Sequence, residues 1–568
     1  WMDEFYSFLI LLRIYLAGLS FSFFCFQRQE KKMAVLMGAL LYAFSFWTIF
    51  AAVRHPYFMN PMIYFPLVLA GADRIFRKKR PFLYIFSLAA AVMSNFYFGY
   101  MICLLVMLYC IFRYKAVFGT FRLKQLAGWV GRFLGYSVIA LLLSSVILLP
   151  VALCALQSGR ISADHWIPLL YPLSYYKKFI AAFLSGEAGY WSEMGYTAYG
   201  VLGVFLLFLQ KKKNTLLKIG FCLMTAFMLL PFAGYALNGF AYVANRYAWA
   251  YGMVVAYIFV RTWPDLAELT ERQKKGMVLL GIGYGGIFLL AEEGRTEARL
   301  SALVLLFVLI LWLLTIGMEW MRQKKSTVFQ WCALFGLVLC LVSQALFKYA
   351  PSQGNYVGEF TENNGALLNL TAYSPSTAAV ETGDDSFWRY DQYGTETWQY
   401  HNANLALGLN SVTYYWSLAD SYIFQFQKEM YLNLQRDFLY QNLDSRSFLD
   451  ALTGVKYFVV AAGGEGYVPY GFTEHTVSQW VGKDAETARQ EEAEGRDTSG
   501  LNAVKSNVYG TQNFLPLGYT YDSWISREDY ESLSVTEKQQ ALLQGIVLED
   551  SELPKAAPVF DDQTQEYT

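Results

Sequence analysis

Twelve apolar runs, separated by polar connections, occupy the first 348 residues of this chain. A helix needs about 20 apolar residues to cross the hydrocarbon core of a bilayer, and the longer runs reach that length. Only 16% of the residues are charged, which is low for a soluble protein. The pattern predicts a polytopic α-helical membrane protein with about twelve transmembrane segments, the shorter ones broken or tilted. The runs lie at 6–26, 33–53, 61–73, 81–94, 97–112, 128–153, 196–210, 215–232, 247–261, 276–291, 299–319 and 328–348.

Lysine and arginine are distributed unequally between successive connections. The connections of one alternate set carry 23 of these residues, and those of the other set carry seven. The positive-inside rule assigns the richer set to the cytoplasm, so residues 349–568 are predicted to lie outside the cell. Basic and acidic residues balance at 45 each, and nothing in the chain indicates nucleic acid as a partner.

Residues 349–568 lack long apolar runs and alternate between short strand-like and helical patterns. They predict an extracellular α+β domain, after a multi-span domain at 1–348 whose longest outer loop is 155–195. An acidic stretch at 484–497 is expected to be a mobile loop. Strands are predicted at 388–391, 412–415 and 455–460, and helices at 422–441 and from a capping box of Ser534 and Glu537 to Gly545.

Polar side chains gather near the outer ends of the runs, above all in the stretch 238–247. Arg246 lies there just before the chain re-enters an apolar run. An ionisable residue at this depth is costly unless an anion or a water-filled cavity receives it. A snorkelling anchor in an aromatic belt and a phosphate contact both remain open interpretations. Further polar or aromatic candidates at the same face are Arg54, His55, Asn60, Asn95, Tyr97, Tyr100 and Asn245.

Carboxylates that can act as a general base occur in the loop 155–195. Asp164 is followed by His165, although adjacent side chains need not point the same way. Glu187 and Glu193 are alternative carboxylates in the same loop. For each acid taken singly, a solvated loop charge is the simpler interpretation.

The sequence contains no nucleotide-binding glycine-rich loop, zinc-ligand spacing or nucleophile elbow. Four scattered histidines argue against a histidine-built metal site, whereas a carboxylate-bound divalent cation is compatible with the sequence. The chain opens at Trp1 without a signal-peptide pattern. We therefore expect its numbering to begin inside a longer protein.

Several stretches, in their order and spacing, resemble the YfhO family of bacterial membrane proteins, and the similarity runs nearly end to end. The matching stretches are HPYFMNP at 55–61, DR at 73–74, SNFYFGYM at 94–101, NGF and NRY within 238–247, FWR at 387–389, LTGVKY at 452–457 and NFLPLGY at 513–519.

This resemblance implies a glycosyltransferase of the polytopic GT-C kind. Such an enzyme transfers a hexosyl or N-acetylhexosaminyl group from a polyprenyl-phosphate carrier to a cell-surface polymer, such as lipoteichoic acid, outside the membrane. The family architecture implies a catalytic acid in the first outer loop, of which Asp3 and Glu4 remain here, with Asp164 as a further candidate. The donor phosphate is expected at Arg246, Arg54 and His55. Other substrate contacts are expected at Asn60, Asn95, Tyr97, Tyr100, His165, Glu187, Glu193 and Asn245.

Two other classes of function remain open. A transporter or flippase of a lipid-linked sugar is expected to show discontinuous helices in repeated halves and ionisable residues near the midplane. A non-catalytic scaffold is expected to bind the surface polymer through its external domain. The gathering of polar groups at the outer ends of the runs favours chemistry at that face.

Overall fold

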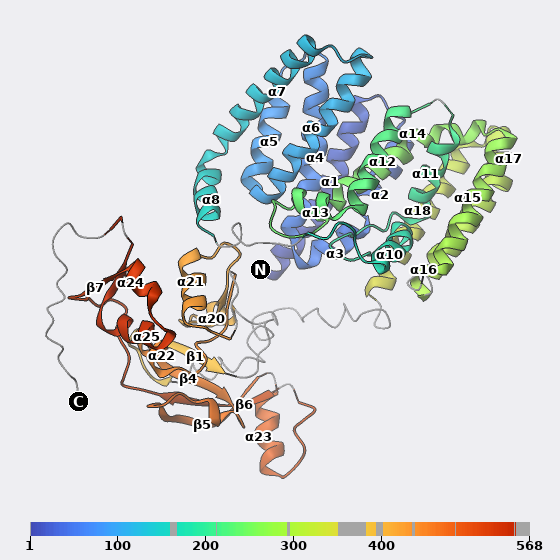
Figure 1. Ribbon diagram of the computed structural model, residues 1–568. Coiled ribbons are helices and arrows are strands. Elements are labelled where there is room, and N and C mark those ends of the chain that lie inside the picture. Colours follow the sequence, from blue (N-terminus) through green and yellow to red (C-terminus); the bar gives the residue numbers. More distant parts are fainter. Residues whose placement is uncertain are drawn as a thin grey trace. The chain divides into compact units, whose positions relative to one another are not determined.

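A computed structural model describes residues 2–158, 167–211, 213–291, 296–349, 382–393, 402–433, 438–482, 484–501, 503–549 and 551–552. The chain divides into two compact units. The first comprises residues 1–153 and 163–360, and the second comprises residues 154–162 and 361–568. Figure 1 shows that the first unit is built from helices and that the second contains the strands.

Each of the twelve apolar runs lies on a helix or on consecutive helices. The helical elements described up to residue 349 are α1 (Met2–Gln27), α2 (Lys32–Ala43), α3 (Phe46–Arg54), η1 (Pro56–Met59), α4 (Asn60–Phe76), α5 (Phe82–Ser94), α6 (Phe96–Phe118), α7 (Leu123–Leu143), α8 (Ser145–Gln157), α10 (Leu173–Leu184), α11 (Thr197–Leu209), α12 (Thr215–Leu229), α13 (Pro231–Leu237), α14 (Ala248–Thr262), η2 (Trp263–Glu268), α15 (Glu271–Leu290), α16 (Glu297–Trp312), η4 (Leu313–Gly317), α17 (Met318–Arg322) and α18 (Ser326–Tyr349).

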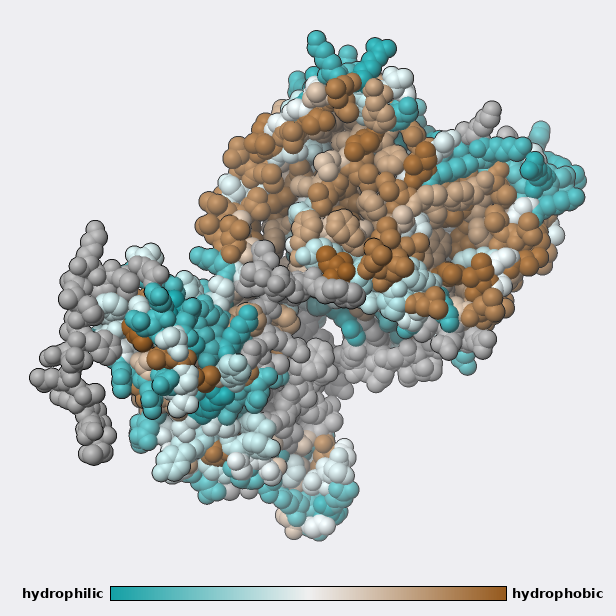
Figure 2. Space-filling view, in the orientation of Figure 1, coloured by the Kyte–Doolittle hydropathy of each residue, from teal (hydrophilic) through white to brown (hydrophobic). Residues whose placement is uncertain are grey.

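Five helical stretches in the described residues are long and apolar enough to cross a membrane, and up to seven if each of two bent pairs is one span. The bent pairs are α2 with α3, at 43°, and α12 with α13, at 92°. Hydrophobic side chains cover much of the visible face of this unit (Figure 2). The first unit is therefore a helical membrane unit with five to seven candidate spans by length and composition.

Local chemistry explains where the helices break. Asn95 has an extended backbone, and its side chain accepts a hydrogen bond from the Phe98 amide at 3.1 Å, so it caps α6 and separates that helix from α5. Pro231 occupies the first turn of α13, where its missing N–H costs nothing, and the extended Leu230 before it produces the sharp turn after α12.

Hydrogen bonds group the connections at two ends of the helices. At one end, Arg77 donates to the Gln27 carbonyl at 2.8 Å, and Arg261 pairs with Glu30 at 3.0 Å. We call this the basic end, because it gathers connections rich in lysine and arginine. At the other end, which we call the aromatic end, Arg299 donates to the Glu187 carbonyl at 2.9 Å. The contacts at the basic end thus bring together connections that are far apart in the sequence.

The second unit is α+β and contains a four-stranded sheet of order β1-β4-β6-β5. β1 pairs with β4 in parallel, and the other two pairs are antiparallel. The remaining strands form two short ladders, β2 with β3 and β7 with β8. The strands are β1 (Arg389–Tyr393), β2 (Tyr414–Tyr415), β3 (Leu439–Tyr440), β4 (Val455–Ala461), β5 (Thr473–Gly482), β6 (Ala503–Gly510), β7 (Trp524–Ser526) and β8 (Ile546–Leu548). The helical elements are α20 (Ala403–Leu407), α21 (Ser421–Glu429), α22 (Ser447–Leu452), η9 (Glu465–Tyr467), α23 (Ala485–Ala493), α24 (Arg527–Ser532) and α25 (Val535–Gln544).

Several predictions for this unit are confirmed. β1 and β4 lie at the expected positions, and β4 is buried along most of its length, as its continuous apolar run indicated. The capping box forms, with the Ser534 side chain accepting from the Glu537 amide and Glu537 accepting from the Ser534 amide. The helix that follows ends before Gly545.

Other predictions were wrong in type or extent. The acidic stretch 484–497, expected to be a loop, contains α23. Its alanine, glutamate, glutamine and arginine residues are good helix formers, and Ala488 anchors it by being buried. The helix expected at 422–441 ends at Glu429, and residues 439–440 form β3. The strand expected at 412–415 is reduced to the two residues of β2.

Candidate functional site

Arg246 lies among four aromatic rings at the aromatic end. Its guanidinium carbon is 4.4 Å from the ring centroid of Trp191, 5.5 Å from that of Tyr242, 5.6 Å from that of Phe58 and 5.7 Å from that of Tyr97. Ring faces attract a cation, and this attraction strengthens as water is excluded. The Arg246 Nε atom is buried and has no hydrogen-bond partner among the described residues. We call these five residues the Arg246 cluster.

The cluster is assembled from segments far apart in the sequence. Phe58 belongs to η1, Tyr97 to the first turn of α6 and Trp191 to the connection before α11. Asn238 joins two of the segments, because the Tyr97 hydroxyl donates to its side chain and its amide donates to the Tyr242 carbonyl at 2.7 Å. The turn after Asn238 needs a positive φ at Gly239, which glycine adopts without strain.

Asn245 fixes the backbone next to Arg246. This fully buried side chain donates to the Ser192 and Tyr175 hydroxyls at 2.9 and 3.0 Å. Its carbonyl oxygen accepts from the Tyr171 and Tyr247 hydroxyls, both at 3.2 Å. Because its donors and acceptors are used inside the protein, Asn245 holds in place the backbone that carries Arg246.

His55 and Arg54 lie beside the Arg246 cluster. The His55 ring is half-buried, with its centroid 4.9 Å from that of Phe58 and 6.1 Å from that of Trp191. Burial, and then the charges of Arg246 and Arg54, lower the pKa of His55. The imidazole is therefore neutral at pH 7. Arg54 is exposed, with its guanidinium carbon 5.4 Å from the Phe50 ring centroid.

Glu193 is a buried carboxyl group two residues after Trp191. Burial, followed by the charge of Glu187, raises its pKa well above the usual value, while Lys348 and Arg54 lower it. Its Oε2 atom has no hydrogen-bond partner in the described part of the chain. Glu187 is exposed, with a carboxylate oxygen 4.0 Å from Lys348 Nζ. A carboxyl group with a raised pKa is suited to proton transfer near neutral pH.

The remaining predicted residues are placed differently. Asn60 accepts from Arg13 Nε at 3.1 Å, and the Tyr100 hydroxyl donates to the Ala236 carbonyl at 2.9 Å, so both have partners within the protein, as Asn95 does in capping α6. Glu4 is exposed on α1. The side chain of Asp3 and the residues Asp164 and His165 lie outside the described residues.

Sequence reasoning missed an ionic network at the basic end. Asp73 is fully buried on α4. Arg28 Nε donates to its carboxylate at 2.9 Å and the Tyr109 hydroxyl at 2.6 Å, and Arg113 Nε lies 2.8 Å away. An aspartate at the end of an apolar run was the available signal, because a carboxylate buried there requires cationic partners. Sequence reasoning also did not predict that Arg13, on α1, donates a hydrogen bond to Asn60.

The described residues contain no group of three or more His, Cys, Asp or Glu side chains placed to hold a metal ion together.

Fold and site together define a class of polytopic helical membrane proteins with an arginine enclosed by aromatic rings at one end of the helices. The chain belongs to the family described as bacterial membrane protein YfhO, whose model matches residues 1–568, so the resemblance drawn from the motifs is confirmed. It is 23% identical over 546 residues to a protein named "Uncharacterized protein YfhO" from Bacillus subtilis (strain 168). The match covers 92% of this chain and 56% of the relative, so the chain spans about half the length of that protein. No solved structure matches the chain.

Proposed function

We propose that this chain is a GT-C glycosyltransferase that moves a sugar from a polyprenyl-phosphate carrier to a cell-surface polymer such as lipoteichoic acid. In this proposal the helical unit crosses the membrane about twelve times, the aromatic end faces outward and residues 349–568 are extracellular. The observation that carries the proposal is the half-buried Arg246, whose Nε donor is buried and unused among the described residues. Arginine donates in a planar fork that matches phosphate oxygens, and aromatic rings suit sugar faces.

The chemistry requires a stabilised leaving group and a proton acceptor. The acceptor hydroxyl attacks the anomeric carbon, the bond from that carbon to the phosphate oxygen breaks, and polyprenyl phosphate leaves with the electron pair. Arg246 and Arg54 stabilise the charge that develops on the phosphate, and neutral His55 donates one further hydrogen bond. A carboxylate takes the hydroxyl proton, and the candidates are Asp3, Glu4, Asp164 and, in its ionised form, Glu193.

Substitution of Arg246 tests this function directly. We expect Arg246→Gln to lower sugar transfer by about 100-fold or more, because one preorganised charge donor at a transition state is worth that much. The measurement is transfer from a radiolabelled polyprenyl-phosphate sugar in proteoliposomes. Arg322→Gln is the matched control. Arg322 is exposed, pairs with Glu319 and is distant in sequence from the Arg246 cluster. Wild-type transfer by both Arg246→Gln and Arg54→Ala would overturn the proposal.

A transporter of lipid-linked sugar is the second candidate. The two bent helix pairs favour it, because discontinuous helices are common in secondary transporters. The two functions separate in proteoliposomes that hold a fluorescent lipid-linked sugar and no acceptor polymer. Movement of the lipid between leaflets without release of polyprenyl phosphate would identify a transporter. Polymer binding with neither activity would identify a scaffold.

A further inference from the structure

A second polar site lies at the basic end, in a cavity of about 620 Å³ between α1, α4, α6, α12 and α14. This volume is within the range of small-molecule pockets. Arg113 on α6 is sixteen residues from Tyr97, which places the two sites about 24 Å apart by the rise of a helix. The cavity is therefore separate from the Arg246 cluster.

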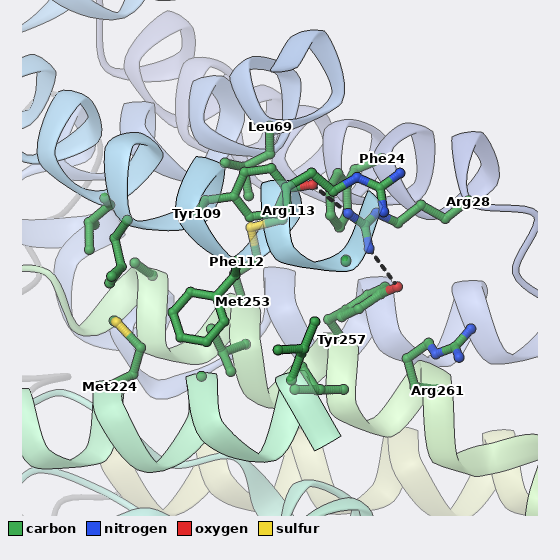
Figure 3. A pocket seen from close by; sticks show the side chains of 18 of the residues that line it. Phe24, Arg28, Leu69, Tyr109, Phe112, Arg113, Met224, Met253, Tyr257 and Arg261 are labelled. Atoms are coloured by element: carbon green, nitrogen blue, oxygen red, sulfur yellow. Dashed lines mark hydrogen bonds between the residues drawn. The ribbon is translucent and has the colours of Figure 1, made fainter. Parts of the chain in front are cut away.

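The cavity wall has two chemically different parts. Figure 3 shows Arg28, Tyr257 and Arg261 on one side of the cavity and Met224 and Phe112 on the other. The apolar part also includes side chains of α4, α6 and α14, among them Leu69, Leu105 and Met253. An occupant that satisfies both parts is amphipathic, with a charged head and an apolar tail.

The charges around the cavity do not balance. Four arginines, Arg28, Arg77, Arg113 and Arg261, line it, whereas the charged acids at the site are Glu30 in the lining and Asp73 behind it. Two positive charges are thus in excess among the described residues. A phosphate monoester carries about −1.5 to −2 at pH 7 and would neutralise them.

The arginines differ in how far their donors are already used. Arg28 donates to Asp73 at 2.9 Å and to the Tyr257 hydroxyl at 3.1 Å, and also to Tyr109. Arg261 donates to Glu30 at 3.0 Å and to Asn214 at 3.2 Å. Arg113 Nε is ion-paired with Asp73 at 2.8 Å, outside hydrogen-bond geometry, and this buried atom has no hydrogen-bond partner in the described part of the structure. Its guanidinium therefore has donors available for a ligand in the cavity.

We propose that this cavity binds a lipid with a phosphate monoester head group, with the phosphate on Arg113 and the chain along the wall of α6 and α12. Arg28 and Arg261 complete the cationic surroundings, and Asp73 holds Arg28 and Arg113 in place. The proposal does not depend on sugar transfer, because it concerns binding at the opposite end of the helices.

Equilibrium binding to the full chain in nanodiscs tests the inference. The probe is tritiated farnesyl monophosphate, and farnesol and inorganic phosphate are the competitors. We expect Arg113→Gln to weaken binding of the probe at least tenfold, roughly the effect of losing one charged hydrogen bond. Arg322→Gln, which changes an exposed arginine outside the cavity, should bind the probe as the wild type does.

A second variant separates ligand binding from protein folding. Gly220 lines the cavity on α12, and a side chain added there has open space apart from Phe112 at 3.9 Å. We expect Gly220→Leu to occupy the apolar part and to weaken binding of farnesyl phosphate severalfold while every arginine contact is kept. Unchanged binding in both Arg113→Gln and Gly220→Leu would overturn the proposal. Inorganic phosphate competing as well as farnesyl phosphate would show a site for a free anion and overturn the lipid assignment.

Discussion

Asp73 is a carboxylate of the helical unit with three charged or polar partners. It is fully buried, and two guanidinium groups and one hydroxyl lie within 3 Å of its oxygens. Removing one partner from such a network leaves the others charged and unpaired in a medium of low dielectric. We expect Asp73→Asn to lower the free energy of unfolding by about 3–5 kcal/mol, measured by thermal unfolding in detergent.

Asp265 supplies the matched control for this prediction. It also pairs with a cation, but its partner Lys213 is 56% exposed. A solvated pair contributes about 0–1 kcal/mol, so Asp265→Asn should be nearly neutral. Equal destabilisation by the two variants would contradict the role that we assign to burial.

Asp391 and Asp450 form a buried carboxyl pair in the second unit. Asp391 accepts from the amides of Gln392 at 2.7 Å and Leu443 at 3.0 Å, and both carboxyl groups are fully buried. Burial raises the pKa of Asp391 to about 7. Burial and the neighbouring Asp391 raise the pKa of Asp450 well above its usual value. The pair therefore retains a proton at pH values where free aspartates are ionised.

The protonated pair predicts a pH dependence of stability. The folded unit holds the extra proton between about pH 4 and 7, whereas the unfolded chain releases it near pH 4. Stability of the second unit should therefore fall as the pH rises through this range. The measurement is hydrogen-exchange protection of β4, corrected for the intrinsic pH dependence of exchange. Asp450→Asn should flatten the profile, whereas Asp497→Asn, at an exposed site, should not. A flat wild-type profile would refute the assignment.

At the scale of elements, α4 and α5 pack unusually closely. A Cβ atom added at Gly71 on α4 would lie 2.6 Å from the backbone nitrogen of Tyr84 on α5. Backbone atoms of a packed helix cannot rotate away as a flexible side chain can, so any larger residue must push the helices apart. Gly71 is two residues from Asp73, so the same shift would disturb the ionic network.

We expect Gly71→Ala to destabilise the helical unit by about 1–3 kcal/mol in the same thermal assay. Gly283→Ala provides the comparison, because nothing lies within 4 Å of a Cβ atom added there. Alanine favours helix over glycine by about 1 kcal/mol, so that variant should be neutral or stabilising. A neutral Gly71→Ala would show that the two helices tolerate separation.

At the scale of the molecule, much of the fold was predictable from local patterns. Hydropathy and capping act over a few residues, which is why the apolar runs, β4 and the Ser534 capping box were located correctly. The break before Phe46 and the register of the sheet were not predicted, since both depend on contacts between distant segments. α23 was not predicted, because the acidic content of residues 484–497 was taken to indicate a loop although these residues have a high helix propensity.

Within the candidate site, Arg246 was predictable from the sequence, but the residues that surround it were not. Arg246 was found because an arginine beside an apolar run is conspicuous. Its partners Phe58 and Tyr97 are 188 and 149 positions away in the sequence, so no local pattern links them to it. The same distance effect hid the partners of Asp73 and those of Asn245, which holds the loop; the substrate contact expected of Asn245 stays a prediction.

The two polar sites share their supporting helices. α6 carries Tyr97 near its start and Arg113 near its end, and α14 runs from just after Arg246 to Arg261. Neither site therefore lies on helices of its own. Recombination between related genes that exchanged either helix would alter both sites at once.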